Sequence, residues 1–483
     1  MKTIALRVLG LVPSSVGYAD IRVVFRRHEG IHVENQLVDQ VLYEESEGIG
    51  LRVLVAGQWG FAATPRLDAA SLQELVHRAV TQARSAVGRG PAAALAPASA
   101  VQATYATPLI RDPFAVPVAE KVGLLLRASA AMQAPHVTAA EASMDLFQDH
   151  KVFANTEGAL IDQTLTESGA GLMATASDGM DVQRRSFPQS VPRAIKGQRG
   201  DFATAGYEHI ESLRLVEEAP RVGEQAAALL TATPCAATTT TLVVSGTQMA
   251  LLIHECAGHP AELDRVLGSE ASAAGGSFME PQLRGKLRFG ADLVTIVADA
   301  TLPGGLGTFA YDDEGTPAQR TILVKHGIVV DYLTSRESAR VFDAWSNGAA
   351  RADGWHRVPL VRMTNVCLEP GGTSLAEMIG TTEDGILVDM NKSLSIDDRR
   401  LSFRFGSEIG WEIKNGKLGR VLKNCVFRGI TPQFWANCDA VGDAASYRLY
   451  GLPSCNKGEP LQVAHIGHGT VPARFRNVAV GVG

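Results

Sequence analysis

The chain has 483 residues, of which 46% are hydrophobic and 20% are charged, and its net charge is −6. This length is more than one hydrophobic core serves and predicts two or three domains. No segment gathers Lys or Arg into a basic stripe, and no apolar run reaches the roughly 18 residues that span a bilayer, so we expect neither nucleic-acid binding nor a membrane span. The few, scattered cysteines exclude a disulfide scaffold and indicate a reducing, cytoplasmic setting. They are Cys235, Cys256, Cys367, Cys425, Cys438 and Cys455.

Residues 1–90 have the pattern of a small α+β domain. The N-terminal segment resembles a signal peptide, but Arg7 interrupts its apolar stretch, and we interpret it as a first strand or helix of a cytoplasmic protein. A small antiparallel meander follows, and then an amphipathic helix over residues 67–85 with Asp68 as a start signal. The expected strands of the meander are 19–25, 30–36, 40–45, 50–56 and 60–63.

An Ala- and Pro-rich stretch, residues 91–109, comes next. Its composition predicts a linker, although a surface excursion within one domain fits about as well. Residues 110–232 then mix helix and strand patterns, which predicts a middle α/β domain. Its expected elements are helices over 118–134 and 208–230 and strands over 138–144, 152–155 and 164–175.

Residues 233–483 are predicted to form a β-rich C-terminal domain. It opens with a β-branched run at 238–245 that leads into a helix. Two dipeptides, Asn415-Gly416 and His326-Gly327, predict tight hairpins between strands. The other expected strands are 293–298, 321–325, 328–333, 386–391, 400–406, 408–414, 417–422 and further strands within 463–480. The predicted fold class is therefore α+β.

The helix of this last domain carries the string LLIHECAGHPAELD, residues 251–264, with the pattern H-E-x-x-x-H. The pattern is formed by His254, Glu255 and His259. In the common zinc helix, H-E-x-x-H, the two histidines are four residues apart and share one helix face. A spacing of five rotates the second histidine by about 140°, so a regular helix cannot present both to one ion.

The neighbours of the second histidine offer a remedy. Gly258 precedes His259 and Pro260 follows it, so regular helix should end or widen there. We predict that an i→i+5 turn, or a helix break, brings His259 beside His254. Glu255 would then face a metal-bound water as a general base, and the C-terminal domain would carry a metal-binding helix.

A catalytic zinc usually takes three protein ligands, and spacing leaves several candidates for the third. Cys256 is turned by about 200° from the first histidine and is interpreted as a core thiol. Glu262 and Asp264 are ligands, carboxylates that hold an imidazole N–H, or solvated charges. Cys455 lies in a small-residue loop, where we expect an exposed thiolate beside Lys457. The remaining candidates are His465 and His468.

The string HECAGHPAELD resembles the metal-binding signature of the TldD/PmbA family of cytoplasmic metallopeptidases. The resemblance extends along nearly the whole chain. Its other segments are GIGLRV at 48–53, GQWGF at 57–61, GGLGTFAYDDEGTP at 304–317, the string Arg362-Met363-Thr364-Asn365, residues 403–418, and Cys455-Asn456-Lys457.

This resemblance implies that His254, His259 and Cys455 are zinc ligands and that Glu255 is the catalytic base. Active members of the family take the third ligand from a Cys-Gly-Lys loop, and Asn456 departs from that pattern. Members without the motif act as metal-free partners, so this chain looks like the active, TldD-type member. The resemblance further implies an enclosed site in a two-subunit assembly, either a homodimer or a heterodimer with a metal-free paralogue, that acts on short or unfolded peptides.

Three residues are candidates for the substrate side of the site. Arg362, near Asn365, could clamp a peptide carboxylate or carbonyl, and His468 could assist an oxyanion. A structural role is at least as consistent with each of them. The carboxylates at 312–314 could form a second cation site, but we favour a polar turn.

The sequence therefore predicts a zinc-dependent cytoplasmic peptidase that hydrolyses short or unfolded peptides, with Glu255 activating a zinc-bound water. Two alternatives stay open. One is a zinc amidase or deacylase that uses the same chemistry on a small molecule. The other is a non-enzymatic assembly subunit in which the zinc is a structural clasp.

Overall fold

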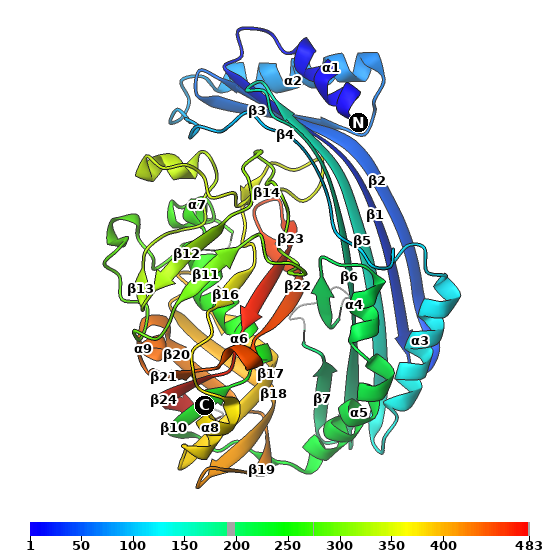
Figure 1. Ribbon diagram of the computed structural model, residues 1–483, viewed down its shortest axis with the longest axis vertical. Coiled ribbons are helices and arrows are strands. Elements are labelled where there is room, and N and C mark those ends of the chain that lie inside the picture. Colours follow the sequence, from blue (N-terminus) through cyan, green and yellow to red (C-terminus); the bar gives the residue numbers. More distant parts are fainter. Residues whose placement is uncertain (191–198, 274, 482–483) are drawn as a thin grey trace.

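A long curved sheet dominates the computed structural model, which describes residues 1–190, 199–273 and 275–481 (Figure 1). The C-terminal half of the chain lies against the concave side of this sheet. Helices and strands are mixed, so the predicted α+β fold class is confirmed. None of the helices described is long and apolar enough to cross a bilayer.

The first sheet has eight strands in the order β3-β2-β1-β5-β6-β4, with β7 and β8 also paired to β6. Four of its strands are 17 to 19 residues long and run antiparallel to their neighbours. The strands are β1 (Tyr18–Glu34), β2 (Leu37–Val55), β3 (Gln58–Thr64), β4 (Gln102–Ala106), β5 (Val137–Asn155), β6 (Leu160–Ser177), β7 (Val182–Phe187) and β8 (Asp201–Ala203).

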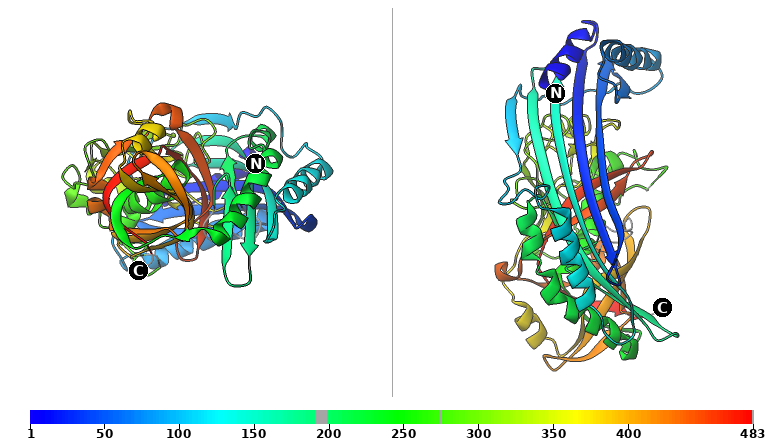
Figure 2. Two further views of the ribbon diagram at one scale, coloured as in Figure 1. Left: turned by 90° about the horizontal axis from the view of Figure 1, so that it is seen from below. Right: turned by 90° about the vertical axis from the view of Figure 1, so that its right-hand side faces the viewer.

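Two separate helical layers cover the two ends of these long strands (Figure 2, right). At one end of β1, Ile21 and Val23 pack in a core with α1 and α2. At the other end, Ile31 and Val33 pack in a second core with α3, α4 and α5. The helices are α1 (Lys2–Leu11), α2 (Ala69–Ala86), α3 (Val118–Ala131), α4 (Tyr207–Ser212) and α5 (Leu215–Thr231). The N-terminal and middle regions of the chain therefore share one continuous sheet.

The predicted antiparallel meander is present as β1, β2 and β3, but the prediction that it consists of five short strands is wrong. Several predicted pairs of short strands are single long strands, because the polar residues between them find partners inside the structure. Arg26 in the middle of β1 pairs with Asp149 of β5 at 2.6 Å, and His28 lies 2.8 Å from Asp145. The merged pairs are 19–25 with 30–36 in β1, 40–45 with 50–56 in β2, and 138–144 with 152–155 in β5.

Two further expectations for residues 86–232 need correction. The stretch 91–109 contains strand β4, which pairs in parallel with β6, so it is more than a linker. The helix predicted over 208–230 is two helices, α4 and α5. Arg214 lies between them with a left-handed backbone (φ 52°), which ends regular helix.

The C-terminal region is built around a second sheet that closes on itself. Strand β17 pairs with β10 and also with β18, so β17-β10-β24-β20-β18 form a ring, which Figure 2 (left) shows from below. Its strands and attachments are β9 (Thr233–Pro234), β10 (Thr238–Val244), β17 (Asp384–Ile396), β18 (Ser402–Lys414), β19 (Lys417–Lys423), β20 (Val426–Ile430), β21 (Cys438–Val441) and β24 (Ala473–Val480). The predicted strands 400–406 and 408–414 are thus one strand, β18.

Smaller sheets complete this region. They are β11 (Ile296–Asp299), β12 (Arg320–Lys325), β13 (Ile328–Val329) and β16 (Val366–Leu368), the pair β14 (Ala350–Arg351) and β15 (Leu360–Val361), and the pair β22 (Arg448–Lys457) and β23 (Gln462–Thr470). Both predicted hairpins are confirmed: Asn415-Gly416 joins β18 to β19 and His326-Gly327 joins β12 to β13, each with positive φ at both positions.

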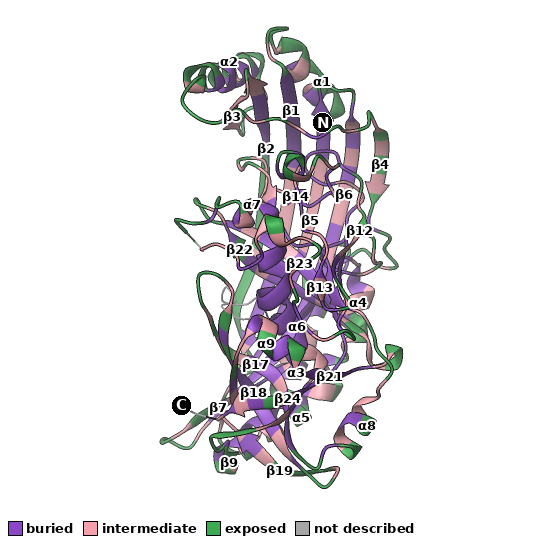
Figure 3. Ribbon diagram, turned by 90° about the vertical axis from the view of Figure 1, so that its left-hand side faces the viewer, coloured by how far each residue is buried: buried purple, intermediate pink, exposed green. Residues whose placement is uncertain are grey.

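One helix of the C-terminal region lies deep in the structure. Helix α6 (Gly246–Ile253) follows β10 and is buried from Gln248 to its end (Figure 3). The hydroxyl of Ser245 caps its N-terminus and also donates to Asp389 of β17 at 2.7 Å. The shorter helices are α7 (Leu263–Val266), α8 (Leu375–Gly380) and α9 (Thr431–Ala436).

We expect Lys121→Met to lower the free energy of unfolding by about 3–5 kcal/mol. Lys121 of α3 is fully buried and its Nζ lies 2.7 Å from Oε1 of Glu29 in β1, so the substitution leaves a buried carboxylate without its counter-ion. Arg66→Ala is the matched control, because Arg66 and Asp68 form an exposed pair. Thermal melting measures both variants. A Lys121→Met protein that melts like the wild type would contradict this assignment.

Candidate metal centre

The motif segment departs from regular helix at the predicted place. Helix α6 continues into a π-helical turn over His254–Gly258, in which the N–H of His259 donates to the carbonyl of His254. Of the two alternatives that the sequence predicts, the i→i+5 turn is confirmed and the helix break is not. The π-helical turn directs the two imidazoles toward each other, with ring centroids 4.8 Å apart.

The residues around the turn explain why it forms. Pro260 has no backbone N–H, so it cannot continue the helix, and a short 3₁₀ turn follows over His259–Ala261. Gly258 is required by close packing, because a Cβ there would lie 2.0 Å from Sδ of Met363. A glycine therefore stands where the side chain of Met363 packs directly against the helical turn.

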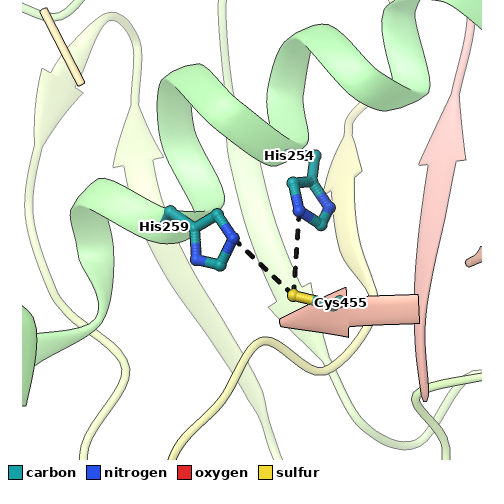
Figure 4. Close-up of side chains that lie close together, drawn as sticks. All are labelled: His254, His259 and Cys455. Atoms are coloured by element: carbon teal, nitrogen blue, oxygen red, sulfur yellow. Dashed lines mark hydrogen bonds between the residues drawn. The ribbon is translucent and has the colours of Figure 1, made fainter. Parts of the chain in front are cut away.

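Three side chains meet in a cluster that could hold a metal ion (Figure 4). Sγ of Cys455 lies 3.7 Å from Nε2 of His254 and 3.6 Å from Nε2 of His259. A tetrahedral zinc ion, at about 2.3 Å from sulfur and about 2.1 Å from nitrogen, would separate these atoms by about 3.6 Å. All three residues are buried. The donor types and their spacing therefore fit zinc.

Cys455 reaches the histidines from a strand. The prediction of an exposed loop thiolate is wrong, because Cys455 lies in β22, pairs with Ala464 of β23 and is 2% exposed. Burial alone would raise the pKa of the thiol, but its interactions with His259 and Arg362 outweigh burial and hold the pKa below its ordinary value. Cys455 is thus the kind of thiol that readily becomes a thiolate ligand.

A relay of hydrogen bonds sets the tautomer of His254. Nδ1 of His468 lies 3.1 Å from the carbonyl of Val366, so it must carry a proton and donate it. Nε2 of His468 then accepts from Nδ1 of His254 at 2.9 Å. Burial lowers the pKa of His254 to about 4, so the ring is neutral near pH 7 and its Nε2 lone pair faces Cys455.

A carboxylate sets the tautomer of His259 in the same way. Oε2 of Glu262 lies 2.9 Å from Nδ1 of His259 and also contacts Arg265 at 3.3 Å and Lys457 at 3.4 Å. Burial raises the pKa of Glu262, but Lys457, His259 and Arg265 outweigh it and hold the pKa well below its ordinary value. Of the roles that the sequence left open for Glu262, the geometry selects the one that holds an imidazole N–H.

Lys457 is buried and belongs to the same hydrogen-bond network as Glu262. Its Nζ donates to Oδ1 of Asp264 and to the carbonyl of Val361, each at 2.6 Å. Asp264 in turn accepts from the N–H of Val361. Asp264 therefore fastens the end of β22 to the motif segment, and it is no part of the His-His-Cys cluster.

A pocket of about 440 Å³ opens onto the cluster and is lined by both histidines, Cys455, Glu255, Arg400 and Ser454 among others. Oε2 of Glu255 lies 2.5 Å from Nη1 of Arg400. Burial would raise the pKa of Glu255, but its interactions with His254 and His259 and the charge of Arg400 outweigh burial and hold the pKa below its ordinary value. The carboxylate is therefore ionised near pH 7 and can accept a proton.

The candidates for the substrate side do not line this pocket. Nη1 and Nη2 of Arg362 donate to the carbonyls of Gln462 and Cys455, and Asn365 bonds to the loop that contains Gly307. His468 lies behind His254, as described above. In the structure, all three side chains hold the walls of the site together.

The remaining sequence candidates lie outside the cluster. Cys256 is fully buried, as predicted for a core thiol, and burial raises its pKa to about 12. Nδ1 of His465 lies 2.5 Å from Oε2 of Glu167, and both residues line another cavity. The carboxylates at 312–314 accept hydrogen bonds from backbone N–H groups or pair with Lys151 and Arg52, which agrees with a polar turn.

Sequence reasoning missed two residues of the site. Arg400 lies in the turn between β17 and β18, far from the motif in the chain, and nothing in its sequence context marks it. Met363 is part of a string that the family resemblance singles out, yet only the structure shows that it packs on Gly258.

Comparison with known proteins identifies the family of the chain. Family models for the first, central and C-terminal domains of the PmbA/TldA metallopeptidases match residues 19–83, 111–232 and 237–480. The chain therefore belongs to this family of metallopeptidases, and the resemblance stated from the sequence is confirmed.

Curated relatives and solved structures extend over nearly the same length. A metalloprotease of Methanothermobacter thermautotrophicus is 30% identical over 470 residues, which cover 97% of this chain and 96% of the relative. A metalloprotease of Synechocystis is 29% identical over 485 residues, 98% of this chain and 96% of its own. The crystal structure of TldE from Thermococcus kodakarensis is similar in fold, with a TM-score of 0.71 at 14% identity and complete coverage of both chains.

We expect His468→Phe to weaken metal binding by about 10- to 100-fold, because Nδ1 of His254 loses the acceptor that fixes its tautomer. Competition with a chromophoric chelator measures the affinity. His465→Phe is the matched control, since it alters the same strand at a residue that faces Glu167. Equal affinities of the two variants and the wild type would show that the relay does not orient His254.

Proposed function

We propose that this chain is a zinc-dependent peptidase whose metal is held by His254, His259 and Cys455. The observation that carries the proposal is the buried cluster of two imidazole nitrogens and one thiol beside an ionised glutamate. Thiolate and imidazole together favour zinc over the harder divalent ions. A relative from Saccharolobus solfataricus, 26% identical over 184 residues (38% of this chain and 39% of the relative), is named a zinc metalloprotease TldD homolog.

The number of donors favours a catalytic over a structural zinc. Structural sites are closed by four protein ligands, whereas catalytic sites use three and keep one position open. Within the described parts of the chain, the metal-ligating cluster contains three residues, and all three line a pocket. A substrate carbonyl could therefore reach the open position.

Glu255 supplies the proton transfer. Bound zinc would lower the pKa of a water in the open position and polarise the scissile carbonyl. The carboxylate of Glu255 takes the proton from the attacking water as the new C–O bond forms. It then gives that proton to the departing amine nitrogen as the C–N bond breaks, so Glu255 ends in its starting state.

An exposed strand edge supports an extended peptide as substrate. Between Ser393 and Ile396, β17 pairs with β18 on one side, and no strand of the described chain pairs with its other edge. Leu394, Ser395 and Ile396 line the metal pocket. A peptide added to this edge would be held by backbone hydrogen bonds, which accept many side-chain sequences. We therefore propose short or unfolded peptides as the substrate class.

We also propose where the protein is located and how it assembles. We infer a cytoplasmic protein from the six free cysteines, which a reducing compartment would preserve. TldE of Thermococcus kodakarensis has the same fold, which supports pairing of this chain with a second family member or with a copy of itself. Size-exclusion chromatography of the purified chain, alone and with a family paralogue, separates the two forms.

We expect Glu255→Gln to retain zinc and to lose about 10²- to 10⁴-fold in turnover of an unstructured peptide, because the amide cannot accept the proton. Metal analysis and peptide digestion, followed by mass spectrometry, measure the two properties on one sample. Unchanged turnover would contradict the role of Glu255. Hydrolysis of small amides by the wild type, with all unstructured peptides left intact, would favour an amidase.

We expect Cys455→Ser to lose zinc about as severely as His254→Ala. Cys256→Ser is the matched control, because Cys256 is equally buried and adjacent to the motif glutamate but lies outside the cluster. Zinc content after dialysis measures all three variants. Full occupancy in Cys455→Ser would remove this residue from the site.

A further inference from the structure

An arginine lies in the metal pocket in direct contact with the proposed base. Arg400 lines the pocket, and its Nη1 lies 2.5 Å from Oε2 of Glu255. The side chain is 13% exposed, and that of Glu255 is 9% exposed. The two side chains thus form a largely buried ion pair in the pocket that contains the cluster.

The backbone of Arg400 is held firmly. Its φ of 60° is left-handed, which is rare for a residue with a long side chain. Its N–H donates to the carbonyl of Asp397 at 3.0 Å, and its own carbonyl accepts from the hydroxyl of Thr431 at 3.1 Å. These contacts fix the turn between β17 and β18, and the contact with Glu255 holds the guanidinium in place.

The guanidinium of Arg400 has an N–H donor that no hydrogen bond uses. Nη1 is used on Glu255, but Nε is buried and has no hydrogen-bond partner. Buried donors are normally paired, so an unpaired one on a side chain that lines the pocket leaves the guanidinium with capacity for an acceptor that arrives with the ligand. The hydroxyl of Ser454, in the same pocket, is also unpaired but carries no charge.

Peptide hydrolysis creates the acceptor that such a group would bind. When water adds to the scissile carbonyl, the π electron pair moves onto the carbonyl oxygen, which becomes an alkoxide. Fixed donors aimed at this oxygen stabilise the transition state more than the substrate. A permanently charged guanidinium is a stronger partner for it than a neutral hydroxyl.

We propose that Arg400 is a second catalytic residue, whose guanidinium binds the carbonyl oxygen of the scissile peptide bond as that oxygen gains negative charge. The inference rests on the proposed peptidase function. Glu255 accepts the proton of the attacking water while Arg400 stabilises the alkoxide. When the carbonyl reforms, the C–N bond breaks and the proton passes from Glu255 to the leaving nitrogen.

The test compares Arg400→Ala and Arg400→Lys with Arg399→Ala. Arg399 is the adjacent residue, but its side chain is exposed and pairs with Glu280 outside the pocket. We expect Arg400→Ala to lower kcat on an unstructured peptide about 10²- to 10³-fold with KM changed little. Arg400→Lys should recover part of the loss, and Arg399→Ala should match the wild type. Zinc content and melting temperature verify that each variant is folded and loaded.

A phosphinic peptide mimics the tetrahedral transition state, and its binding is measured by calorimetry. This measurement distinguishes direct binding of the carbonyl oxygen by Arg400 from an effect of Arg400 that acts only through Glu255. In a Glu255→Gln background, adding Arg400→Ala should still raise the dissociation constant of the phosphinic peptide on the order of 10²-fold. An unchanged dissociation constant would mean that Arg400 acts only through Glu255, and a raised KM with unchanged kcat would make it a substrate clamp. Either result overturns the inference.

The two proposals fail in different ways. Wild-type cleavage of peptides together with full activity of Arg400→Ala would overturn the role of Arg400 alone. Zinc-loaded wild type that neither cleaves unstructured peptides nor binds the phosphinic peptide would overturn the peptidase function, and the role of Arg400 with it.

Discussion

The docking of the β22–β23 hairpin onto the motif helix is the constraint on which the metal centre depends. The hairpin carries Cys455 to the histidines from a position 201 residues after His254. It also supports each histidine in a second way, since His468 accepts from His254 and Lys457 approaches the Glu262 carboxylate that holds His259. Because these groups are buried, each depends on the others for its hydrogen bonds and charge balance. The geometry of the metal ligands therefore depends on the correct folding of the whole C-terminal region.

Much of this site could be predicted from local sequence. The five-residue spacing of the histidines, read with Gly258 and Pro260, predicts a wider helical turn or a helix break, and the structure has the wider turn. Other parts could not be predicted in this way. Which face of β22 carries Cys455 depends on strand pairing, and the contact of Arg400 with Glu255 depends on where a distant turn comes to rest. Such contacts follow from the tertiary fold and leave no periodic signal.

The fold shows the same division. Short-range signals with a local cause were reliable, such as the Asn415-Gly416 hairpin and the capping of α2 by Asp68. The long strands were missed because polar residues in their middle have the pattern of turns. Arg26 and Glu29 are acceptable there only because Asp149 and Lys121 face them from other elements. A partner distant in sequence therefore changes how a polar residue should be interpreted.

The central claim is that two imidazoles and one thiolate from these segments bind a single zinc ion. X-ray absorption at the zinc edge of the zinc-loaded protein tests it most directly. We expect one sulfur neighbour at about 2.3 Å and nitrogen or oxygen neighbours at about 2.0–2.1 Å, with imidazole scattering beyond them. A spectrum without a sulfur shell, or with several sulfur neighbours, would contradict the account.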